Sequence, residues 1–325
     1  MRRRDFIAGL GGAAAWPVVA KAQQPAKPVI GFLSTMFSGE AALAFTTAFV
    51  AGLNQAGFAE GRNVLIEFYH EGPQLHLLSD AANELSRRPV SLIVALGTIS
   101  ALAAKSTTTK VPVVFVTGDD PVERGLVATL NRPGGNVTGV TFASAALGAK
   151  RLQLLRSLAP KATLIGLLAD ASPESQSQSR DQQEAARAIG QQLIVFDAKT
   201  DDDIDRAFEN FAERQVGAMS IAGGPFLASR RGRLITLVAG LAIPAMYSLR
   251  QFAEEGGLMS YGANLAEAMM QAGHYAGRIL RGEKPSDIPV LQPTKFELIV
   301  NVKTAKTLGI DLPPMLLALA DEVIE

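Results

Sequence analysis

Small hydroxyl residues, glycines and an acidic pair stand directly after the short apolar runs of this 325-residue chain. They are Ser34, Thr35, Gly97, Thr98 and the pair Asp119-Asp120 in the first half, and Gly223, Gly224 and Pro225 in the second. Where such residues open a helix, backbone N–H groups and the helix dipole can hold a carboxylate or another anion. The acidic pair would suit a ligand ammonium instead. The pattern indicates a binding site for a small charged molecule.

Aromatic residues lie near the same predicted strand ends and could stack against an apolar or aromatic ligand. They are Tyr69, Phe142, Phe226, Tyr247 and Tyr261. Each feature also has a purely structural explanation, because Ser and Thr before a helix commonly act as N-caps and Gly-Gly-Pro commonly forms a turn. The shared position at strand ends favours the ligand-binding interpretation.

The groups that enzymes of this size commonly use are missing. The sequence contains no cysteine, no Gly-x-Ser-x-Gly elbow and no phosphate-binding Gly-x-x-x-x-Gly-Lys-Ser/Thr loop. His70 and His76 could share a metal only if the loop between them folded back, and His274 lies on a predicted helix. We therefore expect a protein that is not an enzyme and has no cofactor or metal. A periplasmic hydrolase or isomerase using Asp119 and Tyr261 is the minority alternative.

The elements that must position these residues alternate between short apolar strands and amphipathic helices. In the first half, strands are predicted at 29–33, 63–69, 91–96, 113–116 and 137–142, with helices at 41–55, 75–88 and 99–106. In the second half, strands are predicted at 163–168, 193–196, 218–221 and 243–247, with helices at 146–158, 176–189, 202–214 and 226–239. Continuous Val/Ile/Leu runs separated by helices are typical of parallel sheets covered on both faces. The fold class is therefore α/β, with two doubly wound, Rossmann-like lobes.

The length also favours two domains, since one hydrophobic core seldom serves about 300 residues. We expect lobe 1 at 28–141, with about 261–292 returning to it through a helix at 264–280, and lobe 2 at 142–260. The segment 293–325, with a strand at 296–300 and two short helices, is not assigned to either lobe. Lys and Arg total 31, as do Asp and Glu, which argues against a nucleic-acid partner.

The first 22 residues resemble an export signal. Arg2, Arg3 and Arg4 precede a weakly apolar run that is too short and too rich in glycine to span a bilayer. Ala20-Lys21-Ala22 has the small-x-small pattern of a cleavage site. The paired arginines are similar to a twin-arginine signal. We expect a periplasmic protein whose signal is cleaved near Ala22.

Several stretches are similar to one family. They are 111–122 (VPVVFVTGDDPV), 130–140 (LNRPGGNVTGV), 148–152 (GAKRL) and the C-terminal segment from Asn301 onward. Together they resemble the tryptophan/tyrosine-type substrate-binding proteins of ABC transporters, which have the type I periplasmic-binding-protein fold. The resemblance implies a multi-strand hinge and a ligand held between the lobes. It places Ser34, Thr35, Gly97, Thr98 and Asp119 at the cleft, with Asp170, Gly223, Gly224 and Pro225 opposite and Tyr261 near the hinge.

Two stretches depart from the family pattern at predicted cleft walls. The second strand runs into Tyr69-His70-Glu71 where the family usually has an arginine and a tryptophan, and the loop after Leu168 lacks the common Asn-Pro. An aromatic amino acid or a related aromatic acid is the ligand that the resemblance implies. The expected partners are that small molecule and the permease subunits of an ABC importer, with the protein itself a monomer. A ligand-sensing subunit for a membrane receptor would use the same clamp and remains an alternative.

Overall fold

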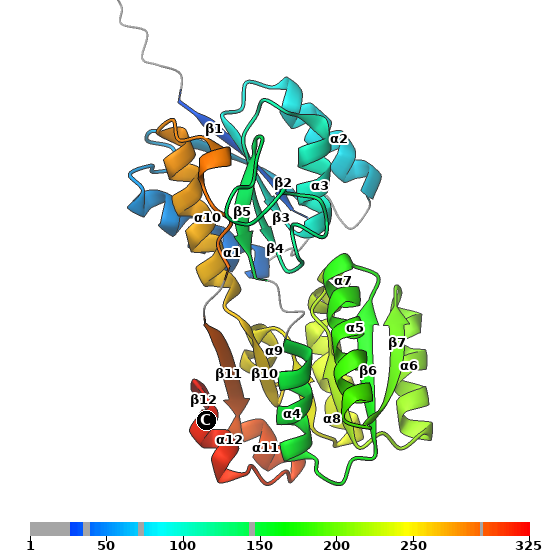
Figure 1. The fold of residues 1–325 in the computed structure, drawn as a ribbon. Coiled ribbons are helices and arrows are strands. Elements are labelled where there is room, and N and C mark those ends of the chain that lie inside the picture. Colours follow the sequence, from blue (N-terminus) through cyan, green and yellow to red (C-terminus); the bar gives the residue numbers. More distant parts are fainter. Residues whose placement is uncertain (1–26, 35–39, 71–74, 143–146, 293–294) are drawn as a thin grey trace, which may run out of the picture.

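The structure is a computed structural model that describes residues 27–34, 40–70, 75–142, 147–292 and 295–325. The predicted signal and Thr35 lie outside the described residues. Within them, the chain forms two lobes, each with its own sheet (Figure 1).

Lobe 1 contains a five-stranded parallel sheet of order β2-β1-β3-β4-β5. Its strands are β1 (Val29–Ser34), β2 (Leu65–His70), β3 (Leu92–Leu96), β4 (Val113–Thr117) and β5 (Val137–Thr141). Helices α1 (Glu40–Gln55) and α10 (Leu265–Leu280) pack on one face, and α2 (Leu75–Arg87) and α3 (Thr98–Thr107) pack on the other. Strands β3, β4 and β5 are buried along their whole length, as expected for a sheet covered on both sides.

Lobe 2 contains a seven-stranded sheet of order β12-β11-β10-β9-β8-β6-β7. Its strands are β6 (Leu164–Asp170), β7 (Gln192–Ala198), β8 (Ala218–Ile221), β9 (Ala245–Tyr247), β10 (Met259–Ala263), β11 (Phe296–Asn301) and β12 (Glu322–Ile324). One face carries α6 (Asp201–Glu213), α7 (Pro225–Ser229), α8 (Arg231–Leu241) and α9 (Arg250–Glu254). The other carries α4 (Gly148–Leu158), α5 (Pro173–Ala188), α11 (Val302–Leu308) and α12 (Pro314–Leu319). The α/β class with two lobes is confirmed.

Three segments connect the lobes. The chain leaves lobe 1 after β5, returns from β10 into α10, and leaves again through 288–295 into β11. Before this last departure, Leu291 pairs with β5, where its N–H donates to Gly139 O at 3.0 Å. The return to lobe 1 begins at Asn264 rather than at 261, because β10 belongs to the lobe 2 sheet.

Several expected elements differ in detail. The helix expected at 226–239 is two helices, α7 and α8, separated at Arg230. The C-terminal segment, not assigned from sequence, supplies β11 and β12 to lobe 2, and β11 runs antiparallel to β10. The helix expected at 176–189 begins at Pro173, because Ser172 caps it by accepting from the N–H of Ser175. This earlier start places Glu174 in the first helical turn.

Helices α1 and α10 cross closely on the outer face of lobe 1. A Cβ added to Gly52 in α1 would lie 1.9 Å from the Met270 carbonyl oxygen, and one added to Gly273 in α10 would lie 2.2 Å from the Phe49 oxygen. Both positions therefore require glycine for the backbones to approach. Through this contact the late helix α10 completes the hydrophobic core of lobe 1.

Candidate functional site

The turn between β3 and α3 forms the lobe 1 side of the site. Gly97 adopts φ 95°, which favours glycine, and its N–H donates to Val116 O at 2.8 Å. Thr98 opens α3, is fully buried, and shares a 2.5 Å hydrogen bond between its Oγ1 and that of Thr117. The Thr98 hydroxyl is thus engaged within lobe 1, and its backbone N–H is the group left to face lobe 2.

Asp119 follows β4, but its charge is already paired. The side chain is 1% exposed, and its Oδ2 accepts from Arg124 Nε at 2.5 Å. Burial raises the pKa of the Asp119 carboxyl above its usual value, while Arg124 acts in the opposite direction. The Thr141 hydroxyl also donates to the Asp119 carbonyl oxygen at 3.0 Å. This carboxylate is therefore committed to lobe 1 rather than open to a ligand ammonium.

Asp170, at the end of β6, joins the starts of two helices in lobe 2. Its Oδ1 accepts from the N–H of Ser172 at 2.9 Å and from the Ser172 hydroxyl at 2.5 Å. Its Oδ2 accepts from the N–H groups of Phe226 and Leu227 at 3.1 and 3.2 Å. A Cβ added to Gly224 would lie 2.2 Å from that Oδ2, so glycine makes room for the carboxylate. Pro225 is the first residue of α7.

A chain of buried polar side chains fixes Gly223 and leads toward β10, the strand that precedes the return to lobe 1. Gln178 Oε1 accepts from the Gly223 N–H at 3.0 Å, and Gln178 Nε2 donates to the Gly223 oxygen at 3.3 Å. Arg151 donates from Nη1 to Gln178 Oε1 at 3.2 Å and from Nε to the Tyr261 carbonyl oxygen at 2.8 Å. Burial lowers the pKa of Arg151 to about 10. The loop at Gly223 and strand β10 are thus linked through Gln178 and the Arg151 guanidinium.

Glu174 joins the two lobes. It is the second residue of α5 in lobe 2, it is 3% exposed, and its Oε1 accepts from the Thr98 N–H of lobe 1 at 2.7 Å. The contact is tight, because a Cβ added to Gly118 would lie 2.6 Å from the Phe142 ring and 3.3 Å from Glu174 Cγ. The strand tips of the two lobes therefore meet at Glu174 and Phe142.

A cavity of about 20 Å³ lies beside this contact. Its lining comes from the tips of lobe 2, from Phe142 and from the return strand: Phe142, Glu174, Gln178, Gly223, Gly224, Ser248, Leu249 and Ala263. The space holds about one water molecule. A larger ligand can occupy it only if the surrounding side chains move apart.

The structure brings together some of the predicted site residues and separates others. Thr98, Phe142, Gly223 and Gly224 converge on the contact between the lobes, and Ser34 ends β1 as a buried residue of the same sheet. Phe226, at the start of α7, has Arg230 over its ring.

The three tyrosines make other contacts. The Tyr69 hydroxyl donates a hydrogen bond to Glu67 and accepts one from Arg88, the residue that follows α2. Tyr247 is 1% exposed and stacks on Phe252 in the lobe 2 core. The Tyr261 ring packs near Phe296.

Glu174, Gln178 and Ser248 were not predicted as site residues. For Glu174 the available signal was Ser172-Pro173-Glu174, a capped helix start directly after a strand. No local pattern shows that its carboxylate reaches the other lobe.

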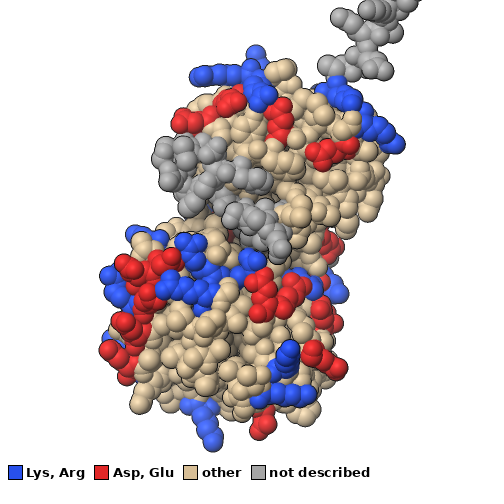
Figure 2. Space-filling view, turned by 180° about the vertical axis from the view of Figure 1, so that it is seen from behind, with Lys and Arg blue, Asp and Glu red and all other residues tan. Residues whose placement is uncertain are grey.

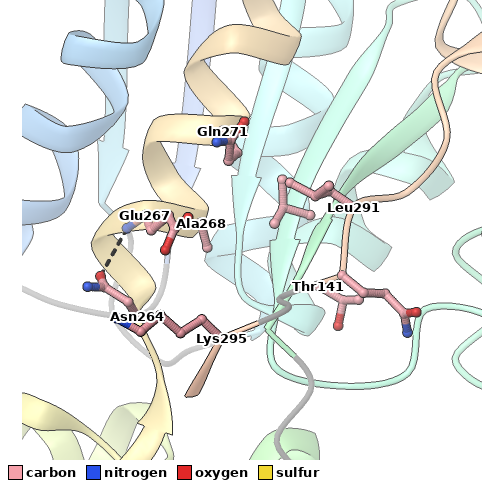
Figure 3. Close-up of a pocket in the computed structure, with 9 residues that line it drawn as sticks. Thr141, Asn264, Glu267, Ala268, Gln271, Leu291 and Lys295 are labelled. Carbon is pink, nitrogen blue, oxygen red and sulfur yellow. Dashed lines mark hydrogen bonds between the residues drawn. The ribbon is translucent and has the colours of Figure 1, made fainter. Parts of the chain in front are cut away.

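A second and larger cavity, of about 230 Å³, lies beside the segments that connect the lobes (Figure 3). Asn264, which caps α10, and Glu267 and Gln271 of its N-terminal half form one wall, and Thr141 and Leu291 face them. Its lining comes from lobe 1 and from the connecting segments. In parallel sheets, ligands bind beyond the carboxyl ends of the strands. The contact between the lobes fits that rule, and we take it as the candidate ligand site.

Charged groups of both signs are interspersed over lobe 2 on the face seen in Figure 2. The acidic start of α6 is paired with arginines, since Asp201 contacts Arg230 at 2.8 Å and Arg233 at 3.3 Å. Within the described part of the chain, no three His, Cys, Asp or Glu side chains gather closely enough to hold a metal ion. None of the helices described is both long and apolar enough to cross a membrane.

Comparison with known proteins identifies the family. The model for ABC transporter substrate-binding proteins matches residues 13–324. A tyrosine-binding protein of Clostridioides difficile is 27% identical over 262 residues, covering 80% of this chain and 75% of the relative. An ABC domain from Streptococcus pneumoniae, solved in complex with L-Trp, superposes with a TM-score of 0.84 at 25% identity and covers 92% of this chain and all of its own. The ligand-free, open structure of a Clostridium difficile substrate-binding protein superposes at 0.67 with 27% identity, covering 92% of this chain and 99% of the other. This chain therefore belongs to the family of ABC transporter substrate-binding proteins.

Proposed function

We propose that this protein captures an aromatic amino acid, or a related aromatic acid, between its lobes and delivers it to the permease subunits of an ABC importer. Substrate-binding proteins of ABC transporters work outside the cytoplasm. In this proposal the protein is periplasmic after cleavage near Ala22, acts as a monomer and leaves its ligand chemically unchanged. Binding thus requires only recognition groups and a hinge.

The convergence of both sets of strand tips at one contact carries the proposal. Thr98 comes from lobe 1, Gly223 and Gly224 come from lobe 2, and Phe142 stands at the connecting segment between them. A group held between these tips touches both lobes only when they are together. A ligand that binds there would therefore stabilise the closed arrangement by its differential affinity for it.

An aromatic ligand is supported by the relatives and by one ring of the site. One relative is named for tyrosine binding and another was solved with L-Trp. Phe142 lines the cavity and is 6% exposed, so its ring could stack on the ligand body. Backbone N–H groups at the start of α3 could hold the ligand carboxylate.

The arrangement of the lobes supports a hinge mechanism. Two relatives of similar identity and coverage give different TM-scores, 0.84 for the L-Trp complex and 0.67 for the ligand-free, open form. Rotation of one lobe against the other lowers such a global score without changing either lobe. The difference supports a hinge motion in which the present arrangement is the closed one and ligand entry requires opening.

Isothermal titration calorimetry with L-Trp, L-Tyr, L-Phe and D-glucose tests the proposal. We expect one of the aromatic amino acids to bind and D-glucose not to bind. Mass spectrometry of the recovered ligand should show no conversion. Binding of glucose alone, or a chemically altered amino acid, would contradict the proposed function.

A pair of variants at one residue tests the anion-binding role of the α3 start. Thr98→Pro removes the backbone N–H, and proline is well tolerated at the first position of a helix. Thr98→Ala keeps that N–H and removes only the hydroxyl bonded to Thr117. We expect Thr98→Pro to weaken amino-acid binding on the order of 10- to 100-fold, with a smaller loss in Thr98→Ala. Equal losses would place the anion elsewhere.

A further inference from the structure

Three buried carboxylates are described at the contact between the lobes, and Glu174 is the one that has neither a positively charged partner nor more than one hydrogen bond. Asp119 pairs with Arg124, and Asp170 accepts four hydrogen bonds within lobe 2. Among the described residues, Glu174 forms no ion pair, and its hydrogen bond is the one from the Thr98 N–H. A buried carboxylate is costly unless a cation or several donors satisfy it. The Glu174 side chain therefore has unused capacity to bind a cationic group.

The Glu174 carboxylate occupies the N-terminal end of α3, a position suited to an anion. Thr98 is the first residue of α3, a helix of 10 residues, so its N–H lies at the positive end of the helix dipole. The carboxylate there comes from the opposite lobe, 76 residues away in sequence. An α-carboxylate of a ligand would seek the same donor. It could reach that donor only by displacing Glu174.

Displacement leaves Glu174 charged, buried and beside the incoming molecule. A ligand that carries a carboxylate alone would place two negative groups near one another. A ligand that also carries an ammonium would supply the cation that Glu174 lacks. The cavity lined by the Glu174 side chain lies next to this contact, and it can admit the ligand once the surrounding side chains move apart.

We propose that Glu174 is an exchangeable group that selects a zwitterionic amino acid over the corresponding simple acid. The ligand carboxylate replaces Glu174 at the Thr98 N–H, and the displaced Glu174 carboxylate binds the ligand ammonium. This inference rests on the proposed function and narrows its ligand class to amino acids. It assigns to Glu174 the ammonium-binding role that the sequence suggested for Asp119.

Two ligand pairs and one substitution test the inference. Affinities are measured by calorimetry for L-Trp against indole-3-propionate and for L-Tyr against 3-(4-hydroxyphenyl)propionate. The wild-type protein should prefer the better-binding amino acid over its des-amino partner by about 100-fold or more. Glu174→Gln should weaken amino-acid binding and leave the des-amino acid equal or tighter, so the preference should fall by at least about 10-fold.

Two further variants separate charge from structure. Glu184→Gln removes an exposed carboxylate from the same helix and should leave both affinities unchanged. Glu174→Asp keeps the charge on a shorter side chain and should retain most of the preference even if the hydrogen bond to Thr98 is lost. Thermal unfolding of each variant establishes that it is folded.

The outcomes distinguish this inference from the proposed function. Equal weakening of both ligands by Glu174→Gln, or an unchanged preference, would overturn the role of Glu174 while leaving the binding protein intact. A wild-type protein that binds the des-amino acids as tightly as the amino acids would also overturn it. Failure of every ligand to bind the wild-type protein would refute the proposed function, and the inference with it.

Discussion

Replacement of Asp170 by asparagine should destabilise lobe 2 far more than a typical loss of one charge. Asp170 is 1% exposed, and both of its oxygens are used. Oδ1 accepts two hydrogen bonds from Ser172 at the start of α5, and Oδ2 accepts two from Phe226 and Leu227 at the start of α7. One carboxylate therefore fixes two helix starts to the end of β6.

The magnitude follows from what an amide can replace. Asparagine keeps one oxygen, so it can serve one helix start, while its NH₂ group faces N–H donors at the other. Hydrogen bonds to a charged acceptor contribute roughly 1.5–3 kcal/mol each, and buried donors left unpaired add their desolvation. Allowing for relaxation, we expect Asp170→Asn to lower the free energy of unfolding by about 3 kcal/mol. That is a large share of the roughly 5–15 kcal/mol that stabilises a typical domain.

Urea unfolding followed by circular dichroism measures this loss. The slope of the free energy of unfolding against urea concentration is compared between variants. The matched control is Asp197→Asn on the neighbouring strand β7, where the exposed carboxylate accepts from Gln176. We expect the control to change stability by less than about 0.5 kcal/mol. A loss below about 1 kcal/mol in Asp170→Asn, with an unchanged slope, would refute this account of the carboxylate.

Three other perturbations have definite expected outcomes. Because burial raises the pKa of Asp119, its contribution to stability is greatest below its unfolded pKa and falls as pH rises through the folded one. The free energy of unfolding of wild type minus that of Asp119→Asn should therefore decrease between pH 3 and pH 6 in urea titrations, and an increase would contradict the shift. Gly52→Ala should lower the free energy of unfolding by about 3 kcal/mol, because the added Cβ would push Met270 away. Gly240→Ala, where the added Cβ would meet open space, should leave the free energy of unfolding unchanged or raise it in the same assay. Thr200→Ala should lower the free energy of unfolding by about 1 kcal/mol, because it removes the side chain that caps α6. An unchanged melting temperature in a thermal scan would argue against that cap.

The α/β architecture was predictable because the strands of buried parallel sheets are continuous apolar runs. Strands β1, β3 and β4 each stand out as short apolar segments, and β1 and β3 are followed by a helix. Strand β10 was not predicted, because Met259–Ala263 has a polar serine and a glycine and is too short for a clear pattern. Its partner β11 is antiparallel, so the βα alternation gives no sign of the pairing.

The candidate site was predictable only in part. Glycines at helix starts, such as Gly97, are visible because their conformation restricts the residue type. Long-range polar partners are not visible, since nothing near Glu174 in sequence shows that its carboxylate crosses to the other lobe. Arg124 lies only five residues from Asp119, but spacing alone does not show that the two side chains pair. Aromatic residues such as Tyr247 were misleading, because a ring near a strand end can equally pack inward.

The close crossing of α1 and α10 has a consequence for how the polypeptide matures. The first lobe cannot complete its core until residues 265–280 of 325 have been synthesised, and the second lobe waits for β11 and β12. A ribosome-bound chain therefore holds two unfinished halves until α10, β11 and β12 have emerged. Truncation at the boundary near residue 142 should release a fragment that lacks its outer helix, exposes apolar surface and tends to aggregate. Neither half is complete without a segment that comes late in the sequence.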